Sequence, residues 1–208
     1  MTAATLDAVL NCIADQATCG RVIVALAGAP GSGKSTLAEQ IAERLNASKP
    51  GFAAVLPMDG FHFDDSVLDA AGLRPRKGAP DTFDVGGLRH TLQRLRARDE
   101  DVVAVPVFDR DIEIARAGAR LIPCSVAVVV AEGNYLLLDR PPWAALRPLF
   151  DVAILLDVPE PVLRMRLEER WRGYGLDDDA VRRKIDGNDL PNARAVMRES
   201  CDPDIRLA

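Results

Sequence analysis

The chain has 208 residues, of which 48% are hydrophobic, as expected for one globular domain of ordinary size. Its formal net charge of −5 predicts no general attraction to nucleic acid or to an anionic membrane, and no apolar run approaches the roughly 20 residues of a membrane span. The four cysteines lack C-x-x-C spacing, which predicts free thiols and a cytoplasmic location. The sequence leaves open whether copies associate into a homo-oligomer.

Predicted helices and strands alternate along the chain. Residues 1–20 carry apolar residues at helical spacing and no basic leader, so we expect an amphipathic helix and not a signal peptide. Helical patterns follow at 35–48, 85–97 and 161–172. Nearly continuous apolar runs predict strands covered on both faces at 21–28, 52–57, 102–108, 126–133 and 152–158. The final segment, "DPDIRLA", is a candidate for one more edge strand.

This alternation predicts one α/β domain over residues 1–208, with a mainly parallel sheet of five or six strands between two layers of helices. Residues 60–84 and 173–194 lack clean periodicity and are expected to be functional excursions from the sheet. Ligands of parallel sheets bind beyond the carboxyl ends of the strands. The residues expected to converge there are Gly28, Asp59, Phe108–Arg110 and Glu132.

A glycine-rich stretch, "GAPGSGKST", follows the first predicted strand and matches the phosphate-loop pattern G-x-x-x-x-G-K-[ST]. Its glycines let consecutive N–H groups point at phosphate oxygens, and the following helix adds its positive N-terminal end. In this motif Lys34 reaches the β- and γ-phosphates, while the Ser35 hydroxyl ligates Mg²⁺. We therefore expect the chain to bind ATP and Mg²⁺. The predicted nucleotide-binding residues are Gly28, Gly31, Ser32, Gly33, Lys34, Ser35 and Thr36.

A phosphate loop alone does not separate kinases from GTPases, motor ATPases and switches. A guanine-reading Asn-Lys-x-Asp motif is excluded, because the sequence contains no Asn-Lys dipeptide. The string "DVGG" at 84–87 matches a switch-like D-x-x-G, and we interpret it as chance. ATPase machines usually place Asp or Asp-Glu after an apolar strand, whereas here "VVVAEG" ends with Glu132 and Gly133.

Six segments together resemble the phosphoribulokinase, uridine kinase and pantothenate kinase family of small-molecule P-loop kinases. The resemblance spans residues 22–195 and is greatest to a bacterial branch labelled as fructose-transport-associated kinases. It implies a three-layer P-loop fold with a helical lid. The segments are the phosphate loop, "MDGFH" (58–62), "RKGAPDTFD" (76–84), "PVFDR" (106–110), "EGNYLL" (132–137) and "NDLPN" (188–192).

The family's pattern implies a role for the acids at the strand ends. Asp59 would accept the proton of an acceptor hydroxyl and share in the Mg²⁺ shell with Ser35 and Glu132, while an ordinary Asp-Gly turn is the alternative. Asp84 would hold substrate hydroxyls or, alternatively, only cap a turn. The predicted substrate-binding residues are Asp59, His62, Asp84, Arg110 and Glu132. Arg76 and Lys77 could bind an anionic group or only be solvated in a loop, and a solvated loop position is likewise the alternative for His62.

The stretch "RMRLEERWRGYG" lies where the family has its lid, about residues 164–194. Arginines there neutralise charge that develops on the transferred phosphoryl group, and closure of the lid excludes water. Arg170 or Arg172 is expected to act with Lys34 in catalysis, and the sequence does not decide between the two. An exposed helix with intrahelical Glu–Arg pairs is the alternative.

The predicted acceptor is a sugar such as fructose, because a compact pocket with several acids and Arg110 suits a polyhydroxylated molecule. Phe108 and Glu113 stand where uridine kinases carry Tyr and, nearby, His, which disfavours a nucleoside. A pantothenate- or nucleoside-type kinase is the first alternative. A nucleotide-binding regulator without an acceptor is the second.

Overall fold

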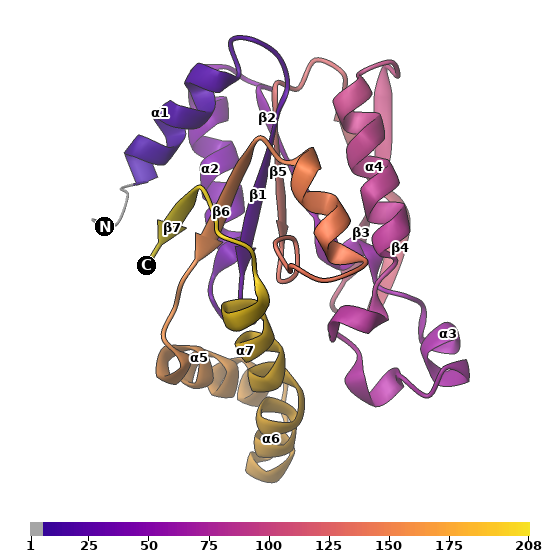
Figure 1. Ribbon diagram of the computed structural model, residues 1–208. Coiled ribbons are helices and arrows are strands. Elements are labelled where there is room, and N and C mark those ends of the chain that lie inside the picture. The colour runs from indigo at the N-terminus through magenta and orange to yellow at the C-terminus, as the bar shows by residue number, and fades with distance from the viewer. Residues whose placement is uncertain (1–5) are drawn as a thin grey trace.

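The computed structural model describes residues 6–208 and has the expected α/β architecture (Figure 1). All pairings in the central sheet are parallel, and its strand order is β2-β5-β1-β6-β7. These strands are β1 (Val22–Gly28), β2 (Ala53–Pro57), β5 (Val128–Gly133), β6 (Val152–Leu156) and β7 (Ile205–Leu207). The predicted α/β class and a parallel sheet of five strands are therefore confirmed, and the candidate edge strand at the C-terminus is β7, although one run predicted for this sheet lies elsewhere.

Helices cover both faces of this sheet, with α1 and α2 on one face and α4 on the other. The helices are α1 (Leu6–Gln16), α2 (Lys34–Ser48), α3 (Asp65–Ala70), α4 (Val85–Ala97), α5 (Glu160–Gly173), α6 (Asp178–Lys184) and α7 (Leu190–Glu199), of which α3 and α6 lie beyond the carboxyl end of the sheet. Successive side chains of a strand point to opposite faces, so β1 contributes to two cores. Val22, Val24 and Leu26 pack with α1 and α2, whereas Ile23, Ala25 and Ala27 pack with α4. The first five residues of the predicted N-terminal helix lie outside the described residues.

The prediction that residues 102–108 form a strand of the central sheet is wrong. They belong to β3 (Val102–Asp109), which pairs antiparallel with β4 (Ile114–Pro123) in a separate two-stranded sheet. Only residues 110–113 join the two strands, too few for the crossover that a parallel neighbour requires. β4 escaped prediction because its sequence is rich in Arg, Ala and Gly and most of its side chains are exposed.

The two excursions lie at the carboxyl-terminal end of the sheet, the lower end in Figure 1. The first leaves β2 through a 3₁₀ turn, Met58–Phe61, continues through α3, and returns where His62 bridges to Phe83. The second begins at the end of α5 and contains α6, a π-helical turn at Ile185–Asp189, and the start of α7. The predicted functional segments therefore flank the same end of the sheet.

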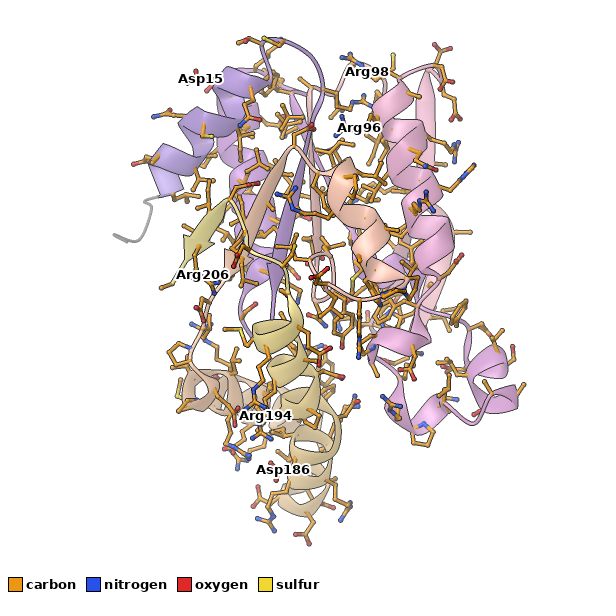
Figure 2. The ribbon with its side chains drawn as sticks, viewed as in Figure 1. Asp15, Arg96, Arg98, Asp186, Arg194 and Arg206 are labelled. Carbon is orange, nitrogen blue, oxygen red and sulfur yellow. The ribbon has the colours of Figure 1, made fainter. Side chains whose placement is uncertain are left out.

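Ion pairs connect outer elements to their neighbours (Figure 2). Arg96 of α4 donates to Asp151 beside β6 at 2.9 Å, and Arg194 of α7 donates to Glu160 of α5 at 2.6 Å. These side chains are 29–48% exposed, so water screens each pair and its contribution to stability is only about 0–1 kcal/mol. The buried apolar faces of the sheet supply the main driving force for folding.

None of the helices formed by residues 6–208 has the length and apolarity that crossing a bilayer would require.

Candidate active site

The phosphate loop turns sharply between β1 and α2. Gly31 and Gly33 have φ values of 80° and 92°, a left-handed conformation that residues with a side chain rarely adopt. α2 begins directly after Gly33, at Lys34, so the loop brings backbone N–H groups to the positive end of a helix. Ser32 is buried in the loop, next to Gly28 at the end of β1. This backbone fits phosphate binding, as the motif predicts.

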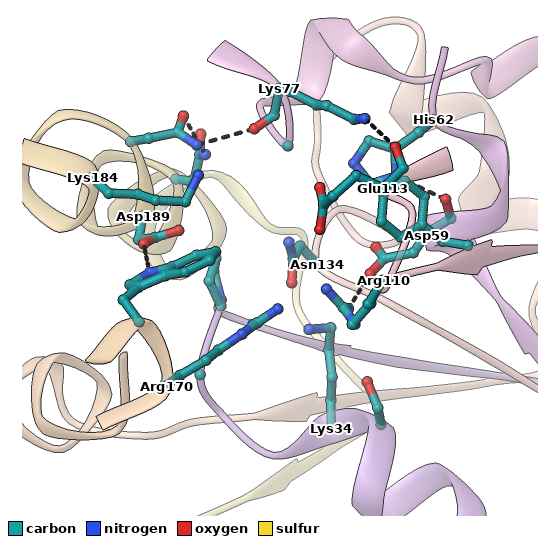
Figure 3. Close-up of a pocket in the computed structure, with 18 of the residues that line it drawn as sticks. Lys34, Asp59, His62, Lys77, Arg110, Glu113, Asn134, Arg170, Lys184 and Asp189 are labelled. Carbon is teal, nitrogen blue, oxygen red and sulfur yellow. Dashed lines mark hydrogen bonds and ion pairs between the residues drawn. The ribbon is translucent and has the colours of Figure 1, made fainter. Parts of the chain in front are cut away.

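A cavity of about 430 Å³ opens beside this loop (Figure 3). Its walls come from the phosphate loop, the first excursion, the turn between β3 and β4, and the lid region. It brings together nine predicted site residues: Gly31, Gly33, Lys34, Ser35, Thr36, Asp59, His62, Arg110 and Arg170. Of the strand ends expected to converge there, those that carry Asp59, Phe108 and Arg110 line the cavity, even though β3 is not in the central sheet, whereas Gly28 and Glu132 lie outside its lining.

Asp59 lies in the 3₁₀ turn directly after β2 and accepts a hydrogen bond from Arg110 Nη2 at 2.7 Å. A Cβ on Gly60 would overlap the carbonyl of Pro106, so β3 packs directly against this turn. Burial opposes the charge of Asp59, but interactions with the His62 ring and with the cations Arg110 and Lys34 hold its pKa below the ordinary value. Asp59 is therefore ionised at neutral pH.

His62 supports the same turn. Its Nδ1 lies 2.7 Å from the backbone oxygen of Asp59, and its ring packs on Phe83 and Phe108, with centroid distances of 4.0 and 4.8 Å. Burial lowers the pKa of His62, although Asp59 opposes this shift. The imidazole is thus a half-buried wall of the cavity and not a solvated loop residue.

Glu132, the last acid of β5, is only 6% exposed and accepts a hydrogen bond from the Ser35 hydroxyl at 3.0 Å. Burial raises its pKa, and the negative charge of Asp59 adds to this effect. Among residues 6–208, no group of three or more His, Cys, Asp or Glu side chains is arranged to hold a metal ion. A serine hydroxyl with one or two carboxylates is instead the partial set typical of Mg²⁺ bound between protein and phosphates.

We expect Glu132→Gln to raise the melting temperature of the ligand-free protein by about 2–4 °C at about pH 8. The folded protein raises the pKa of Glu132 above its ordinary 4.5, so the ionised carboxylate costs stability as the pH rises through that range. Glutamine keeps an oxygen that can accept from Ser35 without the charge. Thermal unfolding at about pH 5 and about pH 8 checks this: the gain should be smaller at the lower pH. An equal gain at both pH values would contradict it.

Asp84 is not brought to the cavity. It is the N-cap of α4, where its carboxylate accepts from the N–H of Gly87 at 2.8 Å, and its side chain is exposed. An Asp at this position satisfies a free N–H of the first turn, a common use of the residue. The predicted role in holding substrate hydroxyls is therefore corrected to the alternative, capping.

The structure separates the two lid arginines. Arg170 lines the cavity, where Figure 3 shows it directed toward Lys34, and its guanidinium lies 5.0 Å from the ring centre of Trp171. Arg172 instead pairs with Glu168 and Asp178 on the exposed side of the lid region. The intrahelical pairing described as the alternative therefore applies to Arg172 and not to Arg170.

Arg166 has a role that the sequence did not predict. Its Nη1 donates to the carbonyl of Ser32 at 3.0 Å, and so connects α5 to the phosphate loop. The spacing of Arg166 and Arg170, one helical turn apart, was the available signal that both face the loop. The acceptor of Arg166 is a backbone carbonyl, which every residue carries, so the side chains of the phosphate loop gave no signal for this bond.

A second group of residues closes the cavity opposite the phosphate loop, and of these only Lys77 was a candidate from the sequence. Lys77 donates to Asp65 at 2.7 Å and to the carbonyl of Glu113 at 2.6 Å, while Asn188 of the π-helical turn donates to the carbonyl of Lys77 at 3.1 Å. These bonds join the first excursion to the β3–β4 turn and to the lid region. The other unpredicted lining residues include Asn134, Trp171, Lys184, Asp189 and Asn192.

A phosphate loop that serves only as a switch needs no second binding site beside the nucleotide. Here the loop faces a cavity that continues past Lys34 to the ionised Asp59, with Arg170 reaching in from the lid region. This arrangement is that of P-loop enzymes that transfer a phosphoryl group to a bound acceptor.

Comparisons with known proteins identify the relatives of this chain, although no family model matches it. A Schizosaccharomyces pombe protein provisionally described as a uridine kinase is 36% identical over 197 residues, which are 90% of this chain and 83% of that protein. The uncharacterized protein YggC of Escherichia coli is 37% identical over 182 residues, covering 86% and 74%. The chain belongs to the family of P-loop kinases related to uridine kinase and pantothenate kinase.

A solved structure supports the same assignment over the full length. It is that of a provisionally named fructose transport system kinase from Silicibacter sp. TM1040, with 43% sequence identity and a TM-score of 0.90. The match covers 99% of this chain and all of that one. The resemblance seen in the sequence motifs, and the three-layer fold it implies, are confirmed.

Proposed function

We propose that the protein transfers the γ-phosphoryl group of Mg-ATP to a hydroxyl of a small molecule, and that this acceptor is a sugar such as fructose. The observation that carries the proposal is the position of Asp59. Its carboxylate lines the same cavity as Lys34 and is held ionised beside Arg110. A proton acceptor facing the phosphate site is what a hydroxyl nucleophile requires.

In the proposed reaction, the phosphate loop and Lys34 hold the phosphates of ATP. Ser35 and Glu132, with Asp59 nearby, would hold Mg²⁺, which when bound neutralises charge on the phosphate oxygens. The acceptor oxygen forms its bond to the γ-phosphorus as the bond to the ADP oxygen breaks, and Asp59 takes the hydroxyl proton. The products are the phosphorylated acceptor, ADP and a proton, which Asp59 releases to solvent.

Lid residues complete the site in this mechanism. Arg170 would stabilise the charge that develops on the transferred group, while Arg166 keeps the phosphate loop attached to α5. Arg110 holds Asp59 until an acceptor hydroxyl takes a position beside it. Closure of the lid region over residues 164–194 would exclude water that otherwise competes as the acceptor.

The composition of the acceptor end supports a sugar. Asp59, Arg110 and Asn134 offer charged and amide groups to several hydroxyls, and the rings of His62 and Phe108 provide an apolar surface for a sugar face. The Silicibacter relative is named for fructose, whereas other relatives are named for uridine and pantothenate. Pantothenate- or nucleoside-type kinases are therefore the first alternative for the acceptor, and a regulator without acceptor is the second.

The test is ADP release from Mg-ATP across a panel of acceptors. The panel contains fructose and other hexoses, ribose, uridine, cytidine, pantothenate and ribulose 5-phosphate. We expect one sugar to raise turnover to about 1–100 s⁻¹, the usual range of kinases. Stimulation by uridine or pantothenate alone would replace the sugar by that acceptor. ATP binding without stimulation by any acceptor would contradict the proposed transfer and favour the regulator.

A further inference from the structure

The cations at the acceptor end of the cavity are paired within the protein. Lys77 contacts Asp65 at 2.7 Å, and Arg110 contacts Asp59 at 2.7 Å. Both cations therefore have a carboxylate partner before any acceptor binds. An anionic acceptor would have to compete with these partners for either cation, because ion pairs that are already formed offer little net attraction.

On the opposite wall, the charge of Lys184 is partly balanced by that of Asp189. The Lys184 ammonium lies 4.4 Å from the ring centre of Trp171, and its charge acts on Asp189, opposing the rise in pKa that burial imposes on that acid. Asp189 in turn accepts a hydrogen bond from Trp171 Nε1 at 2.7 Å. The remaining cations that line the cavity, Lys34 and Arg170, lie at the phosphate-loop side (Figure 3).

Among residues 6–208, one carboxylate at the acceptor end forms no ion pair with a cation. Within residues 6–208, no ion pair includes the side chain of Glu113, which lines the cavity and points into it (Figure 3). Its backbone has φ 55°, a left-handed conformation unusual for a residue with a side chain, and its carbonyl accepts the bond from Lys77. The β3–β4 turn thus presents Glu113 to the acceptor in a defined position.

Given the kinase activity proposed above, on which this inference rests, we propose that Glu113 makes the acceptor end select against anions. The acceptor is then an uncharged polyol or a molecule with a basic nitrogen, because a carboxylate or phosphate on it would meet the unpaired charge of Glu113. Glu113 would thus favour uncharged sugars and nucleosides over hydroxy acids and sugar phosphates. The phosphate loop and Asp59 do not make this distinction.

The test uses pairs of compounds that share a skeleton and differ in charge: sorbitol and gluconate, pantothenyl alcohol and pantothenate, glycerol and glycerate. We expect kcat/KM of the uncharged member to exceed that of the anion by about tenfold at low salt. Glu113→Gln should reduce this ratio about fivefold, and added salt should reduce it in the native protein. The control is Asp111→Asn, which removes the same charge from the same turn outside the cavity lining and should leave the ratio unchanged.

Binding provides a readout that does not depend on turnover. Trp171 lines the cavity, so its fluorescence is expected to report the binding of each compound to the Mg-ADP complex. If the uncharged member binds more tightly and this preference is smaller in Glu113→Gln, the inference is supported, even when no compound is phosphorylated. The absence of phosphorylation would count only against the proposed transfer. Anions that bind or react as well as their uncharged partners overturn the inference while leaving the kinase in place. A ratio unchanged in Glu113→Gln, or no binding by any compound, also overturns it.

Discussion

Asp59→Asn is expected to lower turnover by about 10²–10⁴-fold, the usual contribution of a general base, while the affinity for ATP stays near that of the native protein. Asparagine keeps the size of the side chain and an oxygen that can accept from Arg110, but it cannot take the proton of the acceptor hydroxyl. The measurement is acceptor-dependent ADP release together with equilibrium binding of ATP.

A structural effect of this substitution can be separated from a chemical one. The carboxylate that balances Arg110 is removed, so the melting temperature is compared with that of Asp84→Asn, which changes the same residue type at the N-cap outside the cavity. A thermal shift like that of the Asp84 variant, with a large loss of turnover, would assign the effect to proton transfer. Near-normal turnover of Asp59→Asn would remove Asp59 from the mechanism.

The second large effect is expected at Arg170. Its replacement by alanine should lower kcat by about 10³-fold, because a guanidinium directed at the phosphoryl group stabilises charge that exists mainly in the transition state. KM for the acceptor should change much less, since the ground state carries less of that charge. Steady-state kinetics with saturating Mg-ATP checks both parameters.

Arg172→Ala is the matched control, since Arg172 lies on the same helix but pairs with Glu168 and Asp178 at the surface. We expect its kcat to stay within about twofold of the native value, because exposed ion pairs contribute little. Two silent variants would refute the proposed role of the lid arginines. A larger loss in Arg172→Ala than in Arg170→Ala would mean that the lid rearranges when substrates bind.

Local sequence patterns predicted the parts of the molecule that depend on neighbours in the chain. The phosphate loop is recognisable because Gly31, Gly33 and Lys34 satisfy geometric needs within one strand-loop-helix unit. Asp59 and Glu132 are recognisable because an acid directly after a buried apolar strand lies at the carboxyl end of a parallel sheet. These features also led from the motifs to the correct family.

The tertiary structure decided what depends on pairing between distant segments. Apolar content predicts that residues 102–108 form a strand, but not that the strand joins β4 outside the central sheet, because its partner is a mostly exposed segment without a continuous run of large apolar residues. The choice between capping and binding at Asp84 followed from the direction of its side chain relative to α4. Such directions arise from packing and are not encoded in residue type.

The same division holds within the site. By itself the sequence determined a P-loop kinase with Lys34 and Asp59 on facing sides of a cleft, since these positions follow from strand ends in one sheet. Only the fold chose Arg170 over Arg172 and brought Glu113 into the acceptor end. A helix turns about 100° per residue, and the β3–β4 turn is held at the cavity by bonds from Lys77 to Glu113 and from Arg110 to Asp59, so both outcomes required the three-dimensional arrangement of segments far apart in the chain.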